Sequence, residues 1–478
     1  MIKKLVDNIL NAEVFKSVFL IAAFFYVFGF TGEFIAKFIK IFILWGGIIF
    51  LKDLFKNREI LKNKKNLVLF GMMACVCIST LLNHNQRLIP NIISLLYMGV
   101  EVFILTLVEK NNTKEKILKS INIQFNIIVF LTIICAIASI IIYGLDIKGS
   151  VFNGYHELLI GNFEGRLWGI YGNPNTLGQI GLISVFASMY LVYTNKDKKK
   201  IKIYNYVNIL LQTMCIVLSN SRSTMVALIV SSFVFFLIKV IEREKDKKDT
   251  MLQGLLKNKL KVVGKVIVCM VILMLSLKVL KITLAVAPNI TSLMNIKIEF
   301  SKDKMNETLN KVNREQTTSD VSNGRFSIWK SGFMVLSESP IIGVGPENVN
   351  ERTLKYLPEE MVKETPKMSS NMHNIYLQIL VSHGIITFIL FATYILINVF
   401  AIIKYLFVNK VDDKSKLYNN ILVLSLIVCA ILVINLFDSN LLYFFSLYMV
   451  AVFWIALGNV NKLLELDNEE NKKKKSYS

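Results

Sequence analysis

The chain has 478 residues, of which 54% are hydrophobic, and its mean hydropathy is +0.52. Soluble proteins are typically ~45–50% apolar and lack runs of ~20 apolar residues, so this composition excludes a soluble globular protein. The formal net charge of +21 does not indicate a nucleic-acid partner, because the lysines fall in short clusters between apolar runs rather than on one basic face.

Twelve apolar runs are long enough to cross a hydrocarbon layer of ~30 Å at ~1.5 Å per helical residue. They lie near residues 14–31, 35–51, 67–82, 89–108, 124–144, 175–193, 206–219, 223–241, 263–286, 375–403, 420–437 and 441–459. The sequence therefore predicts an all-α polytopic membrane protein with about twelve transmembrane helices. A single large extracytoplasmic loop carrying amphipathic helices is expected between the ninth and tenth spans.

The connections between these runs alternate between lysine-rich segments and segments that are nearly free of lysine. By the positive-inside rule the lysine-rich set is cytoplasmic, so we expect both termini on the cytoplasmic side. Four parts follow: an N-terminal bundle of about nine helices (1–286), the extracytoplasmic loop (287–373), about three C-terminal helices (374–460) and a basic cytoplasmic tail (461–478). The first run lacks a small-residue cleavage site and is expected to be retained.

The large loop carries eleven basic and eleven acidic residues, a balance that favours a folded external cap over a patch for lipid head groups. Within it, Phe326, Trp329, Phe333 and Leu336 recur at helical spacing. This pattern predicts an amphipathic helix on the outer membrane surface, ended by Pro340.

Three arginines, Arg166, Arg222 and Arg325, lie in separate segments that are expected to face outward, where the positive-inside rule gives no reason for a cation. The planar guanidinium suits a phosphate or pyrophosphate, which it binds with two charge-assisted hydrogen bonds. Each arginine alone is better explained by snorkelling or by a weak surface ion pair. Only together, and with a histidine beside them, do they indicate an anion site.

His373 stands at the start of an apolar helix and is followed by Asn374. Histidine accepts a proton near neutral pH, as an attacking sugar hydroxyl requires. The alternative is that His373 only caps the helix. The remaining histidines, His84, His156 and His383, are weaker candidates.

Asn173-Pro174-Asn175 opens the sixth span, and a helix N-terminus there would offer amide donors to an anion. The motif is equally explained as a plain helix start, and Arg166 would then orient this turn.

Glu101, Lys278 and Lys281 interrupt apolar runs. The lysines are expected to reach toward the outer interface, whereas the sequence identifies no partner for Glu101. The sequence contains no metal-ligand cluster and no phosphate-binding loop for a nucleotide, so neither a metal nor a cofactor is expected.

With these motifs in order, the chain resembles the O-antigen ligase and polymerase family of bacterial membrane glycosyltransferases over roughly residues 160–395. The most specific part is His373-Asn374, nine residues, Gly384, two residues and Thr387. The other signatures are Arg166 through Asn175, Ser221-Arg222, Arg325 with Trp329, and Gly343-Val344-Gly345 with Asn348.

The resemblance implies a glycan donor on undecaprenyl pyrophosphate and transfer outside the bacterial cytoplasmic membrane, without a nucleotide sugar or a metal. It implies that His373 is the general base and that Arg166, Arg222 and Arg325 contact the pyrophosphate. The supporting residues would be Asn173, Asn175, Ser221, Trp329, Gly345 and Asn374. Expected partners are the lipid-linked donor and acceptor, membrane lipid, a chain-length regulator and a flippase, but no nucleic acid.

The resemblance leaves the reaction open. A polymerase would join repeat units into surface polysaccharide such as O-antigen, capsule or exopolysaccharide, whereas a ligase would move a finished glycan to lipid A core, protein or another acceptor. Heavy Lys, Asn and Ile usage is typical of an AT-rich genome, such as that of a Gram-positive organism without lipid A, and favours the polymerase. From other classes, a flippase or transporter and a sensory protein without a reaction remain alternatives, although no internal repeat is visible.

Overall fold

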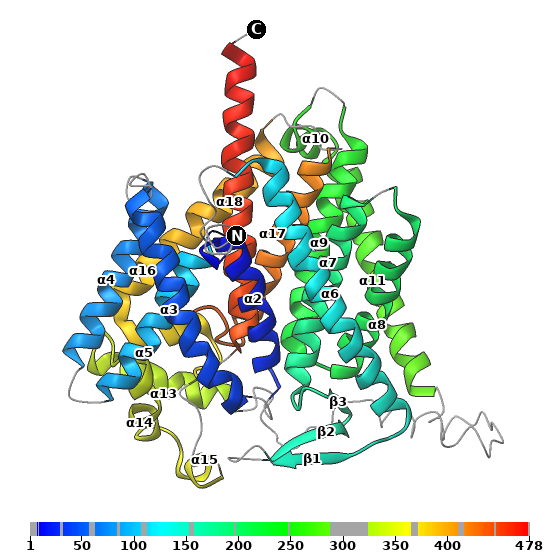
Figure 1. Cartoon of the computed structure of the whole chain (residues 1–478). Coiled ribbons are helices and arrows are strands. Elements are labelled where there is room, and N and C mark those ends of the chain that lie inside the picture. The colour runs from blue at the N-terminus through cyan, green and yellow to red at the C-terminus, as the bar shows by residue number, and fades with distance from the viewer. Residues whose placement is uncertain are drawn as a thin grey trace, which may run out of the picture.

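Long helices run in alternating directions through the computed structural model, and a small sheet and several short helices lie at one end (Figure 1). The structure describes residues 7, 9–28, 32–56, 63–83, 87–106, 112–152, 157–195, 197–246, 249–286, 324–364, 371–409, 415–443 and 446–476. The candidate residues His84 and His156 lie outside these ranges.

The N-terminal half contains helices α2 (Ala12–Tyr26), α3 (Gly32–Lys56), α4 (Lys64–Leu82), α5 (Leu88–Gly99), η2 (Val100–Ile104), α6 (Lys114–Gly144), α7 (Pro174–Thr194), α8 (Lys199–Ser219) and α9 (Arg222–Glu244). The C-terminal half contains α10 (Met251–Lys257), α11 (Lys259–Val286), α13 (Arg325–Glu338), η4 (Pro346–Asn348), α14 (Val349–Leu354), α15 (Glu359–Glu364), α16 (Ile375–Ile403), η5 (Lys404–Val408), α17 (Lys416–Ile434) and α18 (Leu447–Ser476).

Each of the twelve predicted apolar runs overlaps a helix. Among the described residues, nine helical segments are long and apolar enough to cross a membrane, and Leu88–Ile104 is a shorter apolar segment. The nine are Lys64–Leu82, Lys114–Gly144, Pro174–Thr194, Lys199–Ser219, Arg222–Glu244, Lys259–Ala285, Ile375–Val408, Lys416–Ile434 and Leu447–Asn471. The helical membrane class is thus confirmed, whereas the number of about twelve spans stays a prediction.

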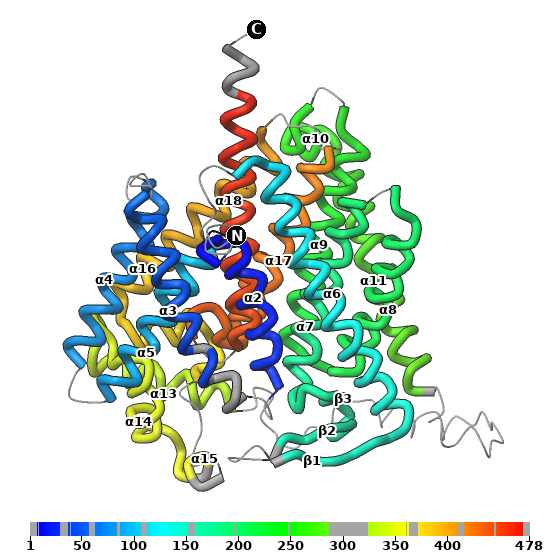
Figure 2. The backbone as a smooth tube through the Cα atoms, in the orientation of Figure 1, coloured from blue at the N-terminus to red at the C-terminus, as the bar shows by residue number. Residues whose placement is uncertain are grey.

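The bundle is organised around α18 and α17. Figure 1 shows α3, α4, α5 and α16 on one side of α18, and α6 to α9 with α11 on the other. In α18, 89% of the most apolar stretch of the helix is buried inside the protein. The corresponding share in α11 is only 17%. Helix α11 packs on α9 and α8 at the edge of the bundle (Figure 2).

Helix α16 is broken at Gly384, where φ is 76° and ψ is 179°. The freed backbone groups are satisfied by the segment after α13: Ile385 N donates to the Pro340 carbonyl over 2.9 Å, and Gly345 N donates to the Ser382 carbonyl over 2.8 Å. A Cβ on Gly343 would lie 2.4 Å from the His383 nitrogen, and one on Gly384 would lie 2.1 Å from the Ile341 oxygen. These glycines are therefore required where two backbones touch.

A three-stranded antiparallel sheet, which the sequence analysis did not anticipate, precedes α7. It consists of β1 (Gly149–Phe152), β2 (Glu157–Phe163) and β3 (Arg166–Gly169) in that order. Glu164 and Gly165 join β2 to β3, both with positive φ, as a two-residue hairpin turn requires. The sheet therefore fixes the position of Arg166 at the start of β3.

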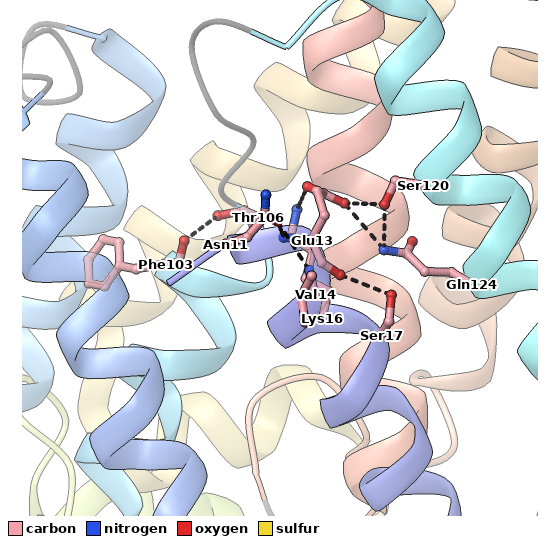
Figure 3. A network of polar contacts seen from close by, with 9 residues as sticks. All are labelled: Asn11, Glu13, Val14, Lys16, Ser17, Phe103, Thr106, Ser120 and Gln124. Atoms are coloured by element: carbon pink, nitrogen blue, oxygen red, sulfur yellow. Dashed lines mark hydrogen bonds and ion pairs between the residues drawn. The ribbon is translucent and has the colours of Figure 1, made fainter. Parts of the chain in front are cut away.

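A buried polar network joins α2 to α6 (Figure 3). Lys16 is fully buried and its Nζ lies 2.8 Å from Glu13 Oε1. The other carboxylate oxygen of Glu13 accepts hydrogen bonds from Ser120 Oγ and Gln124 Nε2, over 2.6 and 3.3 Å. Every charge in this Glu13 network (Glu13, Lys16, Ser120 and Gln124) thus has a partner, as buried charges require.

Glu101 differs from that network. It lies fully buried in η2, a single π-helical turn, and neither of its oxygens has a hydrogen-bond partner among the described residues. The sequence named no partner for Glu101, and the described part of the structure adds none.

Candidate active site

The predicted site residues come from four segments that lie at the same end of the bundle. Arg166 begins β3, Arg222 begins α9, Arg325 begins α13, and His373 lies two residues before α16. Figure 1 shows these starts at the end that carries the sheet and α13 to α15, opposite the C-terminus. Because residues 166, 222, 325 and 373 are far apart in sequence, only the folded bundle brings these segments together.

His373 is held in a left-handed backbone conformation, with φ of 47°. Histidine tolerates this region better than most residues, but the conformation still has an energetic cost that its surroundings must offset. Its backbone N–H donates to Asn371 Oδ1 over 2.7 Å. The helix cap is instead Asn374, whose side chain accepts from the N–H groups of Tyr376 and Leu377. The imidazole of His373 is therefore not used as the cap of α16.

Contacts from two sides fix the segment around His373. Trp329 Nε1 on α13 donates to the Met372 carbonyl over 2.9 Å. On the other side, Ile375 N donates to the Asn435 carbonyl at the end of α17, and Asn374 Nδ2 donates to the Leu436 carbonyl. Trp329 lies one helical turn after Arg325, so α13 positions both the histidine segment and this arginine.

Asp438, which the sequence analysis did not single out, connects the charged groups of the site. Burial lowers the pKa of the half-buried His373, the Asp438 carboxylate acts to raise it, and Arg325 acts to lower it further. Burial likewise lowers the pKa of Arg325, the Asp438 carboxylate raises it, and Arg222 lowers it. Arg222, Arg325, His373 and Asp438 thus form one electrostatic cluster, called the histidine cluster below.

Asp438 is held in place by groups from α7 and its own loop. Gln179 Nε2 donates to Asp438 Oδ2 over 3.0 Å, and Ser439 N donates to Oδ1 over 3.0 Å. Asn440 Nδ2 in turn donates to Gln179 Oε1 over 3.3 Å. One signal was present in the sequence: Asp438 is the only acidic residue between Lys416 and Lys462, and it lies in a connection predicted to face outward.

Among the described residues, the histidine cluster contains two arginines, one histidine and one carboxylate. The buried Nε of Arg325 has no hydrogen-bond partner among these residues. Arg222 is exposed. Such an arrangement suits an anionic ligand, because an anion would pair with the guanidinium groups and accept a hydrogen bond from the unused donor.

Arg166 is engaged differently. It is buried, its Nε donates to the Ser219 carbonyl over 3.1 Å, and one terminal nitrogen donates to Asn175 Oδ1 over 2.7 Å. It thereby joins β3 to the end of α8 and the start of α7. These contacts agree with the alternative that Arg166 orients the turn at Asn173-Pro174-Asn175. Its contact with a pyrophosphate stays a prediction.

Most of the supporting residues serve local structure. Asn173 caps α7 by accepting from the N–H groups of Asn175 and Thr176, which confirms a helix start at Pro174. Ser221 caps α9 by accepting from Thr224 N, so it fixes the helix start that carries Arg222. Gly345 belongs to the contact with the broken α16 described above.

His383, by contrast, is fully buried within α16, where its ring stacks with Tyr443 at 6.1 Å between centroids. Within the described residues, no group of three or more His, Cys, Asp or Glu side chains is arranged to hold a metal ion. The imidazole, guanidinium and carboxylate groups of the histidine cluster can transfer protons and bind anions.

Comparison with known proteins gives two findings. A family model described as O-antigen ligase matches residues 207–392, a stretch that contains Arg222, Arg325 and His373 but neither Arg166 nor Asp438. A stretch of 90 residues is 29% identical to an uncharacterized protein of Haemophilus influenzae, and the match covers 19% of this chain and 23% of that protein. The resemblance seen in the sequence is thereby confirmed: residues 207–392 of this helical membrane protein match the model of the O-antigen ligase family.

Proposed function

We propose that the protein is a glycosyltransferase that polymerises oligosaccharide repeat units carried on undecaprenyl pyrophosphate. The observation that supports this most strongly is the histidine cluster, in which a base candidate lies within the electrostatic reach of Arg325, whose buried Nε has no hydrogen-bond partner among the described residues. The family match over residues 207–392 supports the same general chemistry.

In the proposed reaction, His373 accepts the proton of an acceptor hydroxyl while that oxygen attacks the anomeric carbon of the donor sugar. The bond from this carbon to the pyrophosphate oxygen breaks, and the electron pair leaves with the lipid pyrophosphate. Arg222 and Arg325 hold the charge that grows on this leaving group, a contribution that usually dominates such transfers. Asp438 stabilises the imidazolium that forms, because its carboxylate raises the pKa of His373.

The proposed setting is the bacterial cytoplasmic membrane, with about twelve spans, cytoplasmic termini and an active site that faces outward. The alternation of lysine-rich connections supports this orientation. The product would be a surface polysaccharide such as O-antigen, capsule or exopolysaccharide, made without a metal or cofactor. A chain-length regulator and a flippase are the proposed partners.

The test is turnover in detergent, where no membrane has to be crossed. Purified protein given undecaprenyl-pyrophosphate-linked repeats is expected to release undecaprenyl pyrophosphate and to lengthen the glycan. Transport into vesicles without such release would favour a flippase instead. If alanine substitutions of His373, Arg222 and Arg325 left the surface glycan unchanged, the protein would be better explained as one that catalyses no reaction.

Polymerase and ligase are distinguished in cells that lack the protein. The proposal expects single lipid-linked repeats and no long polymer in these cells. Long polymer that stays on its lipid carrier would contradict the polymerase and assign the ligase reaction.

A further inference from the structure

An apolar groove runs between α9 and α11 at the edge of the bundle. Its volume is about 510 Å³, and Phe233 of α9 forms one wall. The other wall is a stripe along α11 that includes Ile267, Met270, Met274 and, at one end, Lys278. All lining side chains except Lys278 are apolar. The stripe from residue 266 to residue 278 spans ~18 Å at ~1.5 Å per residue, more than half the thickness of a hydrocarbon layer.

The groove opens on the exposed side of α11. Figure 2 shows α11 at the outside of the bundle, beside α8 and α9. Val271 and Met274 are both lining residues and both exposed. A lipid chain therefore has lateral access to the groove without passing through the bundle.

The cationic end of the groove leads to the candidate active site. Lys278 makes no ion pair with the described part of the chain, and Lys281 follows one turn later on α11. Lys281 Nζ donates to Asn220 Oδ1 over 3.1 Å, and Asn220 lies directly before the Ser221-Arg222 start of α9. Lys278 thus lies at the end of the groove, and Lys281 contacts a residue two positions before Arg222.

We propose that this groove holds the isoprenoid chain of the lipid-linked donor, with Lys278 and Lys281 guiding its pyrophosphate to Arg222; this inference rests on the proposed function. The apolar groove is followed by the cations Lys278, Lys281 and Arg222. This order matches a long branched hydrocarbon that ends in two phosphates. Methionine side chains adapt to irregular shapes, and Met270 and Met274 suit a chain that carries methyl branches.

A lipid chain gains no hydrophobic free energy by moving from the bilayer to the groove, because both surroundings are apolar. Selectivity for this donor must therefore come from packing in the groove and from the cations at its end. An ordinary phospholipid shares the hydrocarbon but carries only one phosphate, so it is expected to bind more weakly.

The experiment measures equilibrium binding of undecaprenyl pyrophosphate and of the short farnesyl pyrophosphate to the full-length protein in detergent. Met274→Trp fills the groove and is expected to weaken binding of the long chain about tenfold, as overpacking does, with no change for farnesyl pyrophosphate. Ile272→Trp is the matched control, because Ile272 is exposed on α11 outside the groove, and it is expected to change neither. Lys278→Gln is expected to weaken both ligands, and Lys278→Arg to restore them.

Three results would overturn the inference: unchanged long-chain binding in Met274→Trp, equal loss of both ligands in that variant, or equal competition by phosphatidylglycerol. Ile272→Trp with the same loss as Met274→Trp would also overturn it, because the groove would then not matter. Binding is read without turnover, so this outcome is separate from that of the proposed function. A catalytically inactive protein that still binds the long chain in the groove would contradict only the glycosyltransferase.

Discussion

The Glu13 network and the histidine cluster show two ways of placing charge in a membrane bundle. In the Glu13 network the buried Lys16 forms an ion pair with Glu13, and Ser120 and Gln124 donate hydrogen bonds to the carboxylate of Glu13 (Figure 3). In the histidine cluster Arg325 and His373 both interact with Asp438, and the buried Nε of Arg325 has no hydrogen-bond partner among the described residues. A satisfied network stabilises a structure, whereas a cluster with an unused buried donor is suited to bind an anion.

The largest effect is expected at His373. His373→Asn should lower the single-turnover rate by ~10²–10⁴, because the base is lost while donor contacts remain. Asparagine tolerates positive φ, so this variant retains the backbone conformation better than alanine does. Donor binding and single-turnover rate are measured on the same folded sample. A rate within about threefold of wild type would remove His373 from the chemistry.

A change in the Glu13 network should act on stability alone. Lys16→Met leaves Glu13 without its ion partner and should lower the free energy of unfolding by ~3–5 kcal/mol. Turnover per folded molecule should stay unchanged. Denaturant unfolding in detergent and an activity assay check the two parts. The double variant Glu13→Gln with Lys16→Met is the control and should recover part of the stability, since it removes the unpaired charge.

An intermediate effect is expected when an arginine of the histidine cluster becomes lysine. Arg325→Lys and Arg222→Lys keep the charge but lose the two-pronged geometry, so donor binding should weaken about tenfold or more, and turnover should fall with it. Arg166→Lys provides the contrast, because Arg166 is engaged by Ser219 and Asn175. It should reduce stability more than donor binding. The reverse pattern, measured by ligand titration and thermal unfolding, would place Arg166 rather than Arg325 on the pyrophosphate.

The smallest effects are opposite shifts of the pH dependence. The base form of His373 is the active one, so kcat/KM should rise with pH through the pKa of the free enzyme. The Asp438 carboxylate raises this pKa and Arg325 lowers it. Asp438→Asn should therefore move the acid limb to lower pH, and Arg325→Gln should move it to higher pH. Shifts of the same sign in both variants would contradict the electrostatic cluster.

Much of the helical fold could be predicted from the sequence, because long apolar runs indicate membrane helices. The helix start at Pro174, the helix that begins at Arg325 and the segment before α16 were all predicted from local patterns. Arg222, Arg325 and His373 were found because arginine and histidine in predicted outward segments need an explanation, and the fold brings them into one cluster.

The features that could not be predicted from the sequence depend on contacts between distant segments. Asp438 becomes significant only when the loop after α17 meets Arg325 and His373. The Gly343-Val344-Gly345 turn was recognisable, but its contact with the break at Gly384 requires the folded α16. The strands around Arg166 were too short to stand out beside long apolar helices.

The most direct test of the central claim, that His373 is the base of an anion-binding site, is the pH dependence of the single-turnover rate. Donor must be saturating in wild type and in His373→Asn. In wild type the rate should rise with pH through one ionisation, that of His373 in the complex with the donor. In His373→Asn the residual rate should lose this dependence. An unchanged pH profile in the variant would contradict the claim and leave His373 as a binding residue.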